Sequence, residues 1–276
     1  QLFAGVLDGP VTRVFVTHMH PDHIGMAGWL TRKFACRLWI SRLEYLSCRA
    51  LSVDTGREAP DDAIAFCRRA GWGEEAIETY RTRFGGFGKL IYALPDSYRR
   101  LRDGEEIAIG AQRWRVVVGA GHSPEHVCLY CPELKLLISG DQVLPGISSN
   151  VSVFPAEPDA NPLADWLESL EKLERSVPGD VLVLPSHNQP FRGLHRRIAA
   201  LRDSQHRALD RLREALRQPQ RVVDVYGALF SRPVTADNMQ MSLATGESVA
   251  HLNYLVARGE ARVRMGKEGC AWYQMV

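Results

Sequence analysis

Hydrophobic and polar positions along this chain follow patterns that predict strands and helices in turn. Residues 11–16, Val-Thr-Arg-Val-Phe-Val, alternate and are rich in β-branched side chains, which predicts a strand. Apolar residues at helical spacing predict a helix from about 23 to 34. Further apolar runs predict strands at 35–41, 107–109, 114–118, 127–131, 135–138 and 181–184. This succession predicts two sheets covered by helices.

A long stretch separates the first two predicted strands from the later ones, and His122 follows His23 by 99 positions. Segments 42–50, 60–70 and 74–84 have helical patterns, so we expect a helical insert over about 42–100. Aromatic residues lie around a glycine-rich joint, Gly85-Gly86-Phe87-Gly88. Two interpretations are open: a lid over a pocket, or a packed insert that only adds stability.

The end of the chain predicts a long helix at 194–217 and then a smaller module. Residues 190–217 hold eight arginines against three acids, which we interpret as a solvated helix face rather than an anion site. Helices near 221–230 and 237–257 precede predicted strands at 260–264 and 271–274. Helices followed by a β-hairpin resemble a winged-helix module.

The first candidate chemistry follows the strand at 11–16, in His18-Met19-His20-Pro21-Asp22-His23. His18 and His20 are two positions apart, so in extended backbone they point to the same side and can hold one ion. Asp22 and His23 lie past Pro21, where the chain turns, and can face a second ion. Histidine with carboxylate suits zinc, manganese or iron better than calcium or magnesium.

Three later segments supply matching residue types, and each follows an apolar run that predicts a strand. They are Gly121-His122-Ser123-Pro124-Glu125-His126, Ser139-Gly140-Asp141 and Pro185-Ser186-His187-Asn188. Together with the first motif, these segments resemble the signature of the metallo-β-lactamase superfamily over roughly residues 11 to 195. The resemblance implies one metal site at His18, His20 and His122, a second at Asp22, His23 and His187, and Asp141 as a bridge between them.

Two of the motifs depart from the family pattern without losing a ligand. Asn188 and Ser186 flank His187 where glycines are usual, and Glu125 stands where glycine is common. His126 matches a recurrent family position, and we interpret it as a support for the ligands rather than as a ligand.

The resemblance implies an α/β fold, the αββα sandwich of two mixed sheets flanked by helices. We expect a catalytic domain over 1–195 that contains the helical insert, and a long helix plus the winged-helix-like domain over 196–276. The family carries a β-hairpin region before its first motif, so we expect that an N-terminal part of the fold is missing here.

The predicted function is metal-dependent hydrolysis of a small ester, thioester or lactone. Two divalent ions, zinc first and manganese or iron as alternatives, would hold a bridging hydroxide that attacks the substrate. Asp22 would orient this nucleophile or carry its proton. The alternatives are a nuclease of the same fold, or a non-enzymatic binding module, against which the intact ligand set argues.

Charge and cysteine content limit the partners that we expect. The net charge is +2, and residues 218–276 hold six basic against five acidic residues, so nucleic acid is not the expected partner. No apolar run is long enough to cross a membrane. Six cysteines without a dense pattern fit a reducing compartment, so we expect a cytoplasmic location. Cys128-Leu129-Tyr130-Cys131 is expected to be a buried strand, and the C-terminal module could form a homodimer.

Overall fold

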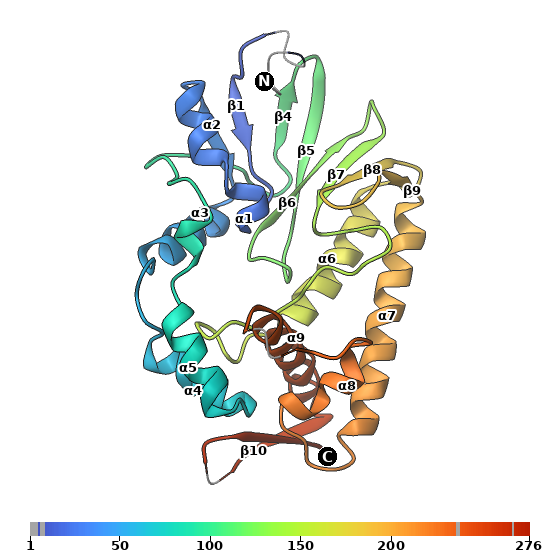
Figure 1. The fold of residues 1–276 in the computed structure, drawn as a ribbon. Helices are drawn as coiled ribbons and strands as arrows, with labels where there is room; N and C mark the ends of the chain where they lie inside the picture. The colour runs from blue at the N-terminus through green and yellow to red at the C-terminus, as the bar shows by residue number, and fades with distance from the viewer. Residues whose placement is uncertain (1–4, 6–8, 236–237, 267) are drawn as a thin grey trace.

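The computed structural model describes residue 5 and residues 9–235, 238–266 and 268–276 (Figure 1). A parallel sheet contains β1 (Arg13–Phe15), β2 (Arg37–Ile40) and β3 (Arg99–Arg100). A second sheet has the order β4 (Glu106–Ile109), β5 (Gln112–Gly119), β6 (His126–Cys131), β7 (Leu136–Gly140), β8 (Leu182–Pro185) and β9 (Phe191–Arg192). The sandwich of two sheets flanked by helices is therefore confirmed, but only the second sheet is mixed, since the described strands of the first are all parallel.

The strand directions explain why the candidate ligands meet. Strand β6 is antiparallel to both β5 and β7, and β7 is parallel to β8, so β5, β7 and β8 run in the same direction. Their carboxyl ends therefore share one edge of the sheet. At that edge the Val127 N–H donates to the Thr17 carbonyl at 2.8 Å, which joins the second sheet to the loop after β1.

Strand β6 is buried along its whole length, as its apolar run predicts. Cys128 packs in the main core and Cys131 in a second cluster on the other face of the sheet. Burial raises the pKa of the Cys128 thiol to about 12, so this residue is not a reactive thiolate, and the two cysteines face different clusters rather than each other. All six cysteines are free.

The prediction of a single helix over 23–34 is wrong, because the chain forms two shorter helices there. These are α1 (Pro21–Ile24) and α2 (Ala27–Lys33). The carbonyl of Gly25 accepts the N–H of Tyr92 at 2.8 Å instead of an N–H of its own helix. A partner more than sixty positions away, which local periodicity cannot reveal, therefore interrupts the helix.

The helical insert contains α3 (Arg42–Val53), α4 (Asp61–Ala70), α5 (Glu74–Arg83) and the 3₁₀ turn Phe87–Lys89. Phe84 packs against the main core, and Phe87 packs against the cluster beneath the first sheet. The Trp72 Nε1–H donates to Thr245 Oγ1 at 2.8 Å, across to the C-terminal module. These contacts favour the packed insert over the lid.

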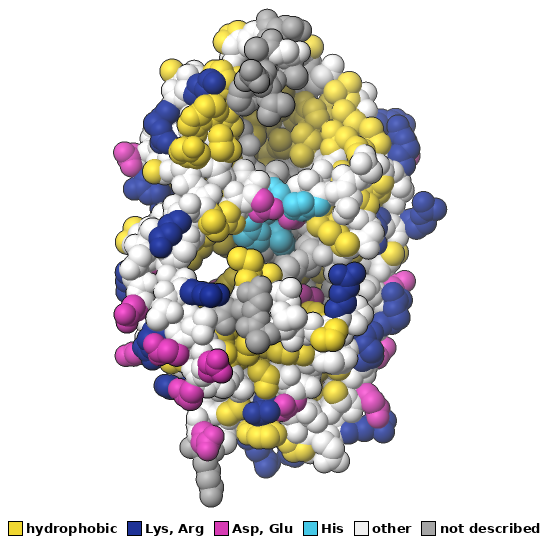
Figure 2. Space-filling model, viewed as in Figure 1, with side chains coloured by type: hydrophobic (Ala, Val, Ile, Leu, Met, Phe, Trp, Pro, Cys, Tyr) yellow, Lys and Arg dark blue, Asp and Glu magenta, His cyan; other side chains and the backbone are white. Residues whose placement is uncertain are grey.

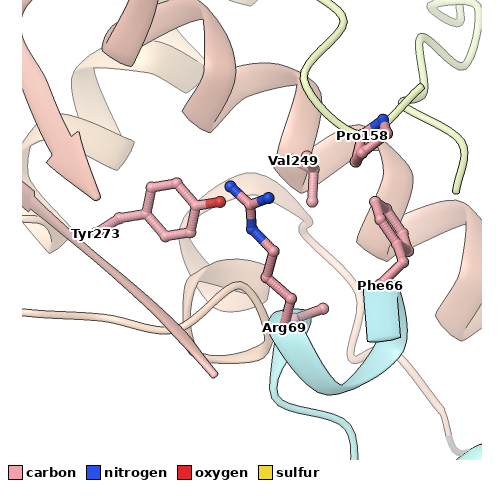
Figure 3. A pocket seen from close by; sticks show the side chains of 6 residues that line it. Phe66, Arg69, Pro158, Val249 and Tyr273 are labelled. Carbon is pink, nitrogen blue, oxygen red and sulfur yellow. The ribbon is translucent and has the colours of Figure 1, made fainter. Parts of the chain in front are cut away.

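Figure 3 shows the junction between α4, the loop before α6 (Pro162–Ser176) and the C-terminal module. The Arg69 side chain of α4 points toward the ring hydroxyl of Tyr273, and Phe66, Pro158 and Val249 surround them. The void between these residues measures about 10 Å³, which is no larger than one water. This junction is packed protein rather than a ligand site.

The C-terminal part has the predicted order of helices and then a hairpin. It comprises α7 (Leu194–Ala215), the 3₁₀ turn Val223–Val225, α8 (Tyr226–Leu229), α9 (Asn238–Ala257), β10 (Ala261–Met265) and β11 (Ala271–Met275). Residue 237, where α9 was expected to begin, lies outside the described residues. Figure 1 shows α7 running from the sheets to the end of the molecule that holds the hairpin. The winged-helix resemblance stays a prediction.

The C-terminal module shares its core with the part that contains the two sheets. Val249, Leu252 and Leu255 of α9 belong to the same buried cluster as Leu170 of α6 and Val183 of β8. Several arginines of α7 make contacts within the protein: Arg197 donates to the carbonyls of Leu144 and Ile147, Arg202 pairs with Glu174, and Arg213 pairs with Glu260. None of the helices in the described ranges is long and apolar enough to span a membrane.

Candidate metal centre

All seven predicted ligands lie at one edge of the sandwich, each at or just after a strand end. His18 and His20 follow β1, and Asp22 and His23 lie in α1. His122 follows β5, Asp141 follows β7 and His187 follows β8. Figure 2 shows histidine side chains, with acidic side chains beside them, gathered in the middle of one face.

The ligands form two groups of three. In the inner triad, His18, His20 and His122, the ligating atoms lie within 4.8 Å of one another. The outer triad, Asp22, His23 and His187, meets the same limit. Within the outer triad, Asp22 Oδ2 lies 3.2 Å from His23 Nε2 and 3.3 Å from His187 Nε2.

Asp141 lies between the two triads. Its Oδ2 atom is 3.3 Å from Nε2 of His23, 3.5 Å from Nε2 of both His122 and His187, and 3.9 Å from Nε2 of His18. One carboxylate oxygen therefore faces histidines of both triads. Gly140 places it there: its φ is +51°, and an added Cβ would lie 2.5 Å from the His126 ring, so only glycine fits.

The side chains present fit a pair of transition-metal ions. Within the described residues, the buried atoms His23 Nε2 and Asp141 Oδ1 have no hydrogen-bond partner, although buried polar atoms normally have one. Burial lowers the pKa of His20 to about 4 and holds the pKa of His18 well below its usual value, so these rings are neutral. Burial acts to raise the pKa of Asp141, but the neighbouring imidazoles of His122 and His23 outweigh it and lower that pKa. Neutral imidazoles and an ionised carboxylate are the forms that bind such metals.

Hydrogen bonds behind the inner triad orient the rings of His18 and His122. His122 Nδ1 lies 2.7 Å from the carbonyl of Asn150, and His18 Nδ1 lies 3.0 Å from Thr17 Oγ1. Because Nδ1 is occupied, Nε2 is the nitrogen that faces the centre. His126 Nε2 accepts the backbone N–H of Asp141 at 3.0 Å and is fully buried, so it holds the loop that carries Asp141.

Glu44, which the sequence patterns did not reveal, ties together two of the ligand loops. Its buried carboxylate accepts the Met19 N–H at 2.8 Å, the Ser123 hydroxyl at 2.6 Å and the Glu125 N–H at 2.8 Å. Burial raises the pKa of Glu44, and these three donors offset part of that rise. One feature of the sequence could have indicated this role. Glu44 lies four positions before Cys48 in a predicted helix, so an acidic side chain shares the face of α3 that is buried.

The two departures from the family pattern have local roles. Glu125 Oε2 accepts the Leu43 N–H at 2.7 Å, so this side chain holds the first turn of α3. Asn188 has a φ of +66°, a value that asparagine tolerates better than most residues, and its Nδ2 donates to the Pro145 carbonyl at 3.4 Å. Neither side chain enters the ligand set.

A cavity of about 470 Å³ opens beside Asp22 and His23. The remaining lining residues come from the end of β1 and from the ends of β7 and β8: Phe15, Val16, Thr17, Ile138, Gly140, Leu184, Pro185 and Ser186. The aromatic residues of the insert do not line it, which again favours the packed insert.

Histidines and carboxylates gathered at one edge of an αββα sandwich are typical of one class of protein, and comparison with protein families agrees. The family model of the metallo-β-lactamase superfamily matches residues 1–187, and the model of the metallo-β-lactamase-like C-terminal domain matches residues 209–276. The chain belongs to the metallo-β-lactamase superfamily, whose members are mostly hydrolases.

A solved β-lactamase domain protein from Burkholderia ambifaria is 42% identical, with a TM-score of 0.91 over 100% of this chain and 78% of that one. A linear primary-alkylsulfatase from Pseudomonas sp. is 23% identical over 69% of this chain and 37% of that protein. An atrochrysone carboxyl ACP thioesterase from Aspergillus fumigatus is 25% identical over 68% of this chain and 47% of that protein. The chain thus spans less than half the length of these last two relatives.

Proposed function

We propose that this protein hydrolyses a small ester, thioester or lactone with the help of two divalent ions, zinc being the expected metal. The observation that carries the proposal is the position of Asp141 Oδ2, within 3.9 Å of Nε2 atoms from both triads. His18, His20 and His122 would hold one ion, and Asp22, His23 and His187 the other. Bound ions would lower the pKa of water from about 15.7 to about 7 and polarise the substrate carbonyl.

Two carboxylates of the protein, Asp22 and Asp141, have different roles in the proposed reaction. Asp22 is the most exposed of the acidic ligands, with 58% of its side chain accessible, so water and substrate can reach its carboxylate. We assign Asp22 to orient the attacking water and to accept its proton, since a carboxylate in hydrogen-bond reach can act as a general base. The Asp141 side chain is 8% exposed, and its carboxylate would bind both ions and so fix the distance between the two triads.

The relatives inform the choice of substrates for a test. One is named a thioesterase and another an alkylsulfatase, so a panel should contain a thioester, a lactone, a carboxylic ester, an alkyl sulfate and a phosphodiester. The zinc-loaded full chain is expected to turn over a member of the first three groups. Asp22→Asn should lose most of this turnover, whereas Asp180→Asn, a change at an exposed acid paired with Lys135, should not.

A phosphodiester as the sole substrate would support the nuclease alternative and contradict the proposal. Turnover in Asp22→Asn equal to that of the wild type would remove Asp22 from its assigned role. A chain that takes up ions but hydrolyses no member of the panel would contradict the proposed substrate class.

A further inference from the structure

The loop 149–153 lies between the metal centre and helix α9. On the side of the centre, the Ser149 hydroxyl donates to the Asp141 carbonyl, and the Asn150 carbonyl faces His122 Nδ1 at 2.7 Å. On the other side, the Val153 N–H donates to the Gly246 carbonyl at 3.0 Å. An added Cβ at Gly246 would lie 2.8 Å from Ser152, so glycine permits this close approach. The loop is thus in contact with two candidate ligands and with the C-terminal module.

Asn150 connects helix α9 to the metal centre. Its Nδ2 donates to Glu247 Oε2 of α9 at 2.8 Å, and its Oδ1 accepts the Ser152 hydroxyl at 2.6 Å. Both ends of the side-chain amide are therefore engaged, which leaves the residue little freedom to rotate. Since its backbone carbonyl is the partner of His122, an anchored side chain also fixes the orientation of that carbonyl.

We propose that Glu247 is a positioning residue for the metal centre: through Asn150 it holds His122 so that Nε2 faces the ion shared with His18 and His20. This inference rests on the two-metal centre proposed above. A carbonyl fixed at Nδ1 keeps the proton on that nitrogen and the lone pair on Nε2, which is the form that binds metal. The C-terminal module is then a structural part of the metal centre.

The same α9 helix offers a matched control. Ser248 is fully buried next to Glu247, and within the described residues its hydroxyl has no hydrogen-bond partner. Ser248→Ala therefore perturbs the packing of the helix without touching the connection to Asn150. Glu247→Gln keeps an oxygen that can accept from Asn150 Nδ2, whereas Glu247→Ala removes it.

The test uses metal-free full-length chains titrated with zinc against a chromophoric chelator. Loss of a residue that orients a metal ligand from outside typically costs 10- to 100-fold in affinity. Glu247 contacts His122 only through Asn150, so the lower end of this range is expected. Glu247→Ala should weaken the binding of one of the two ions about tenfold and leave the affinity for the other unchanged. Glu247→Gln and Ser248→Ala should stay within about twofold of the wild type. In metal-free protein, NMR should show faster exchange of the His122 Nδ1 proton in Glu247→Ala alone.

A folded Glu247→Ala chain with both affinities and the Nδ1 proton exchange of the wild type would overturn the inference, and so would equal weakening of both ions. If Glu247→Ala does not fold, Asn150→Ala, outside the C-terminal module, decides by the same two readouts. The proton-exchange readout needs no metal. A wild-type chain that binds no ions would therefore defeat the proposed function, while the link from Glu247 to His122 would still be judged by exchange.

Discussion

The inner and outer triads of the metal centre differ in burial and in support. The inner side chains of His18 and His122 are 0% and 5% exposed and His20 is half-buried. In the outer triad, Asp22 and His187 are 58% and 44% exposed, while His23 between them is 11% exposed. The inner rings are backed by Thr17 and by the Asn150 carbonyl. The outer triad stands at the open side, next to the cavity beside Asp22 and His23.

This difference predicts different roles for the two ions that we propose. Buried, oriented ligands lose little freedom when an ion binds, so the inner triad should hold its ion tightly. Exposed ligands must be ordered by the ion itself, so the outer triad should bind more weakly and exchange its ion more readily. The outer triad is also the one that a substrate can approach.

The largest effect is expected where the two triads meet. Asp141→Ala removes the carboxylate that faces both, so both ions should bind more than about 100-fold more weakly, beyond the usual cost of losing an outer partner. Turnover should be lost with them. Elemental analysis and zinc titration measure this, with Asp180→Ala as a surface control. If the variant kept both ions and normal turnover, Asp141 would not link the triads.

Removing the support behind the inner triad should cost stability as well as affinity. Glu44→Leu leaves three neutral donors without their acceptor, and we expect the free energy of unfolding to fall by about 3 kcal/mol or more, since each buried donor left unsatisfied costs about 1–3 kcal/mol. Glu44→Gln keeps one acceptor oxygen and should lose less. Denaturant unfolding of metal-free chains measures both. Equal stability of Glu44→Leu and wild type would contradict the role of Glu44.

The buried carboxyl group of Glu247 should make the protein less stable as pH rises. An acid paired with a base at the surface has the opposite effect, because its pKa is lowered on folding. Burial raises the pKa of Glu247 from 4.5 to about 7, so the folded state binds more protons than the unfolded state between these values. Stability should therefore fall as pH rises from about 4.5 through about 7, by up to about 3 kcal/mol at about 1.36 kcal/mol per pKa unit. The stability of Glu247→Gln relative to wild type should rise by that amount over the same range. A pH-independent difference between the two chains would show that the carboxyl group is not perturbed.

The smallest effect is expected at the exposed edge. His187→Ala should lose the outer ion and leave the inner ion in place, while the free energy of unfolding of the metal-free chain changes by no more than about 0.5 kcal/mol, as is usual for surface sites. His206→Ala, at an exposed histidine of α7, serves as the control. Loss of both ions from His187→Ala would contradict the independence of the two triads.

The sequence indicated the seven candidate ligands because their residue types are distinctive, their segments follow strands, and together they resemble a family motif. Parallel directions of β5, β7 and β8 then bring His122, Asp141 and His187 to one edge. Glu44 and the Asn150 carbonyl could not be predicted in the same way. Their roles depend on hydrogen bonds to residues between 25 and 81 positions away, and a backbone carbonyl carries no side-chain signal. The break of the helix at Gly25 likewise depends on a distant partner, Tyr92.

The most direct measurement is a stepwise titration of the metal-free wild-type chain with zinc, combined with elemental analysis of the purified protein. Two ions per chain are expected, bound with clearly unequal affinities, and His187→Ala should abolish only the weaker step. Uptake of no zinc, manganese or iron would contradict the metal centre itself. Two ions of equal affinity, both lost in His187→Ala, would contradict the distinction between a buried, supported triad and an exposed one.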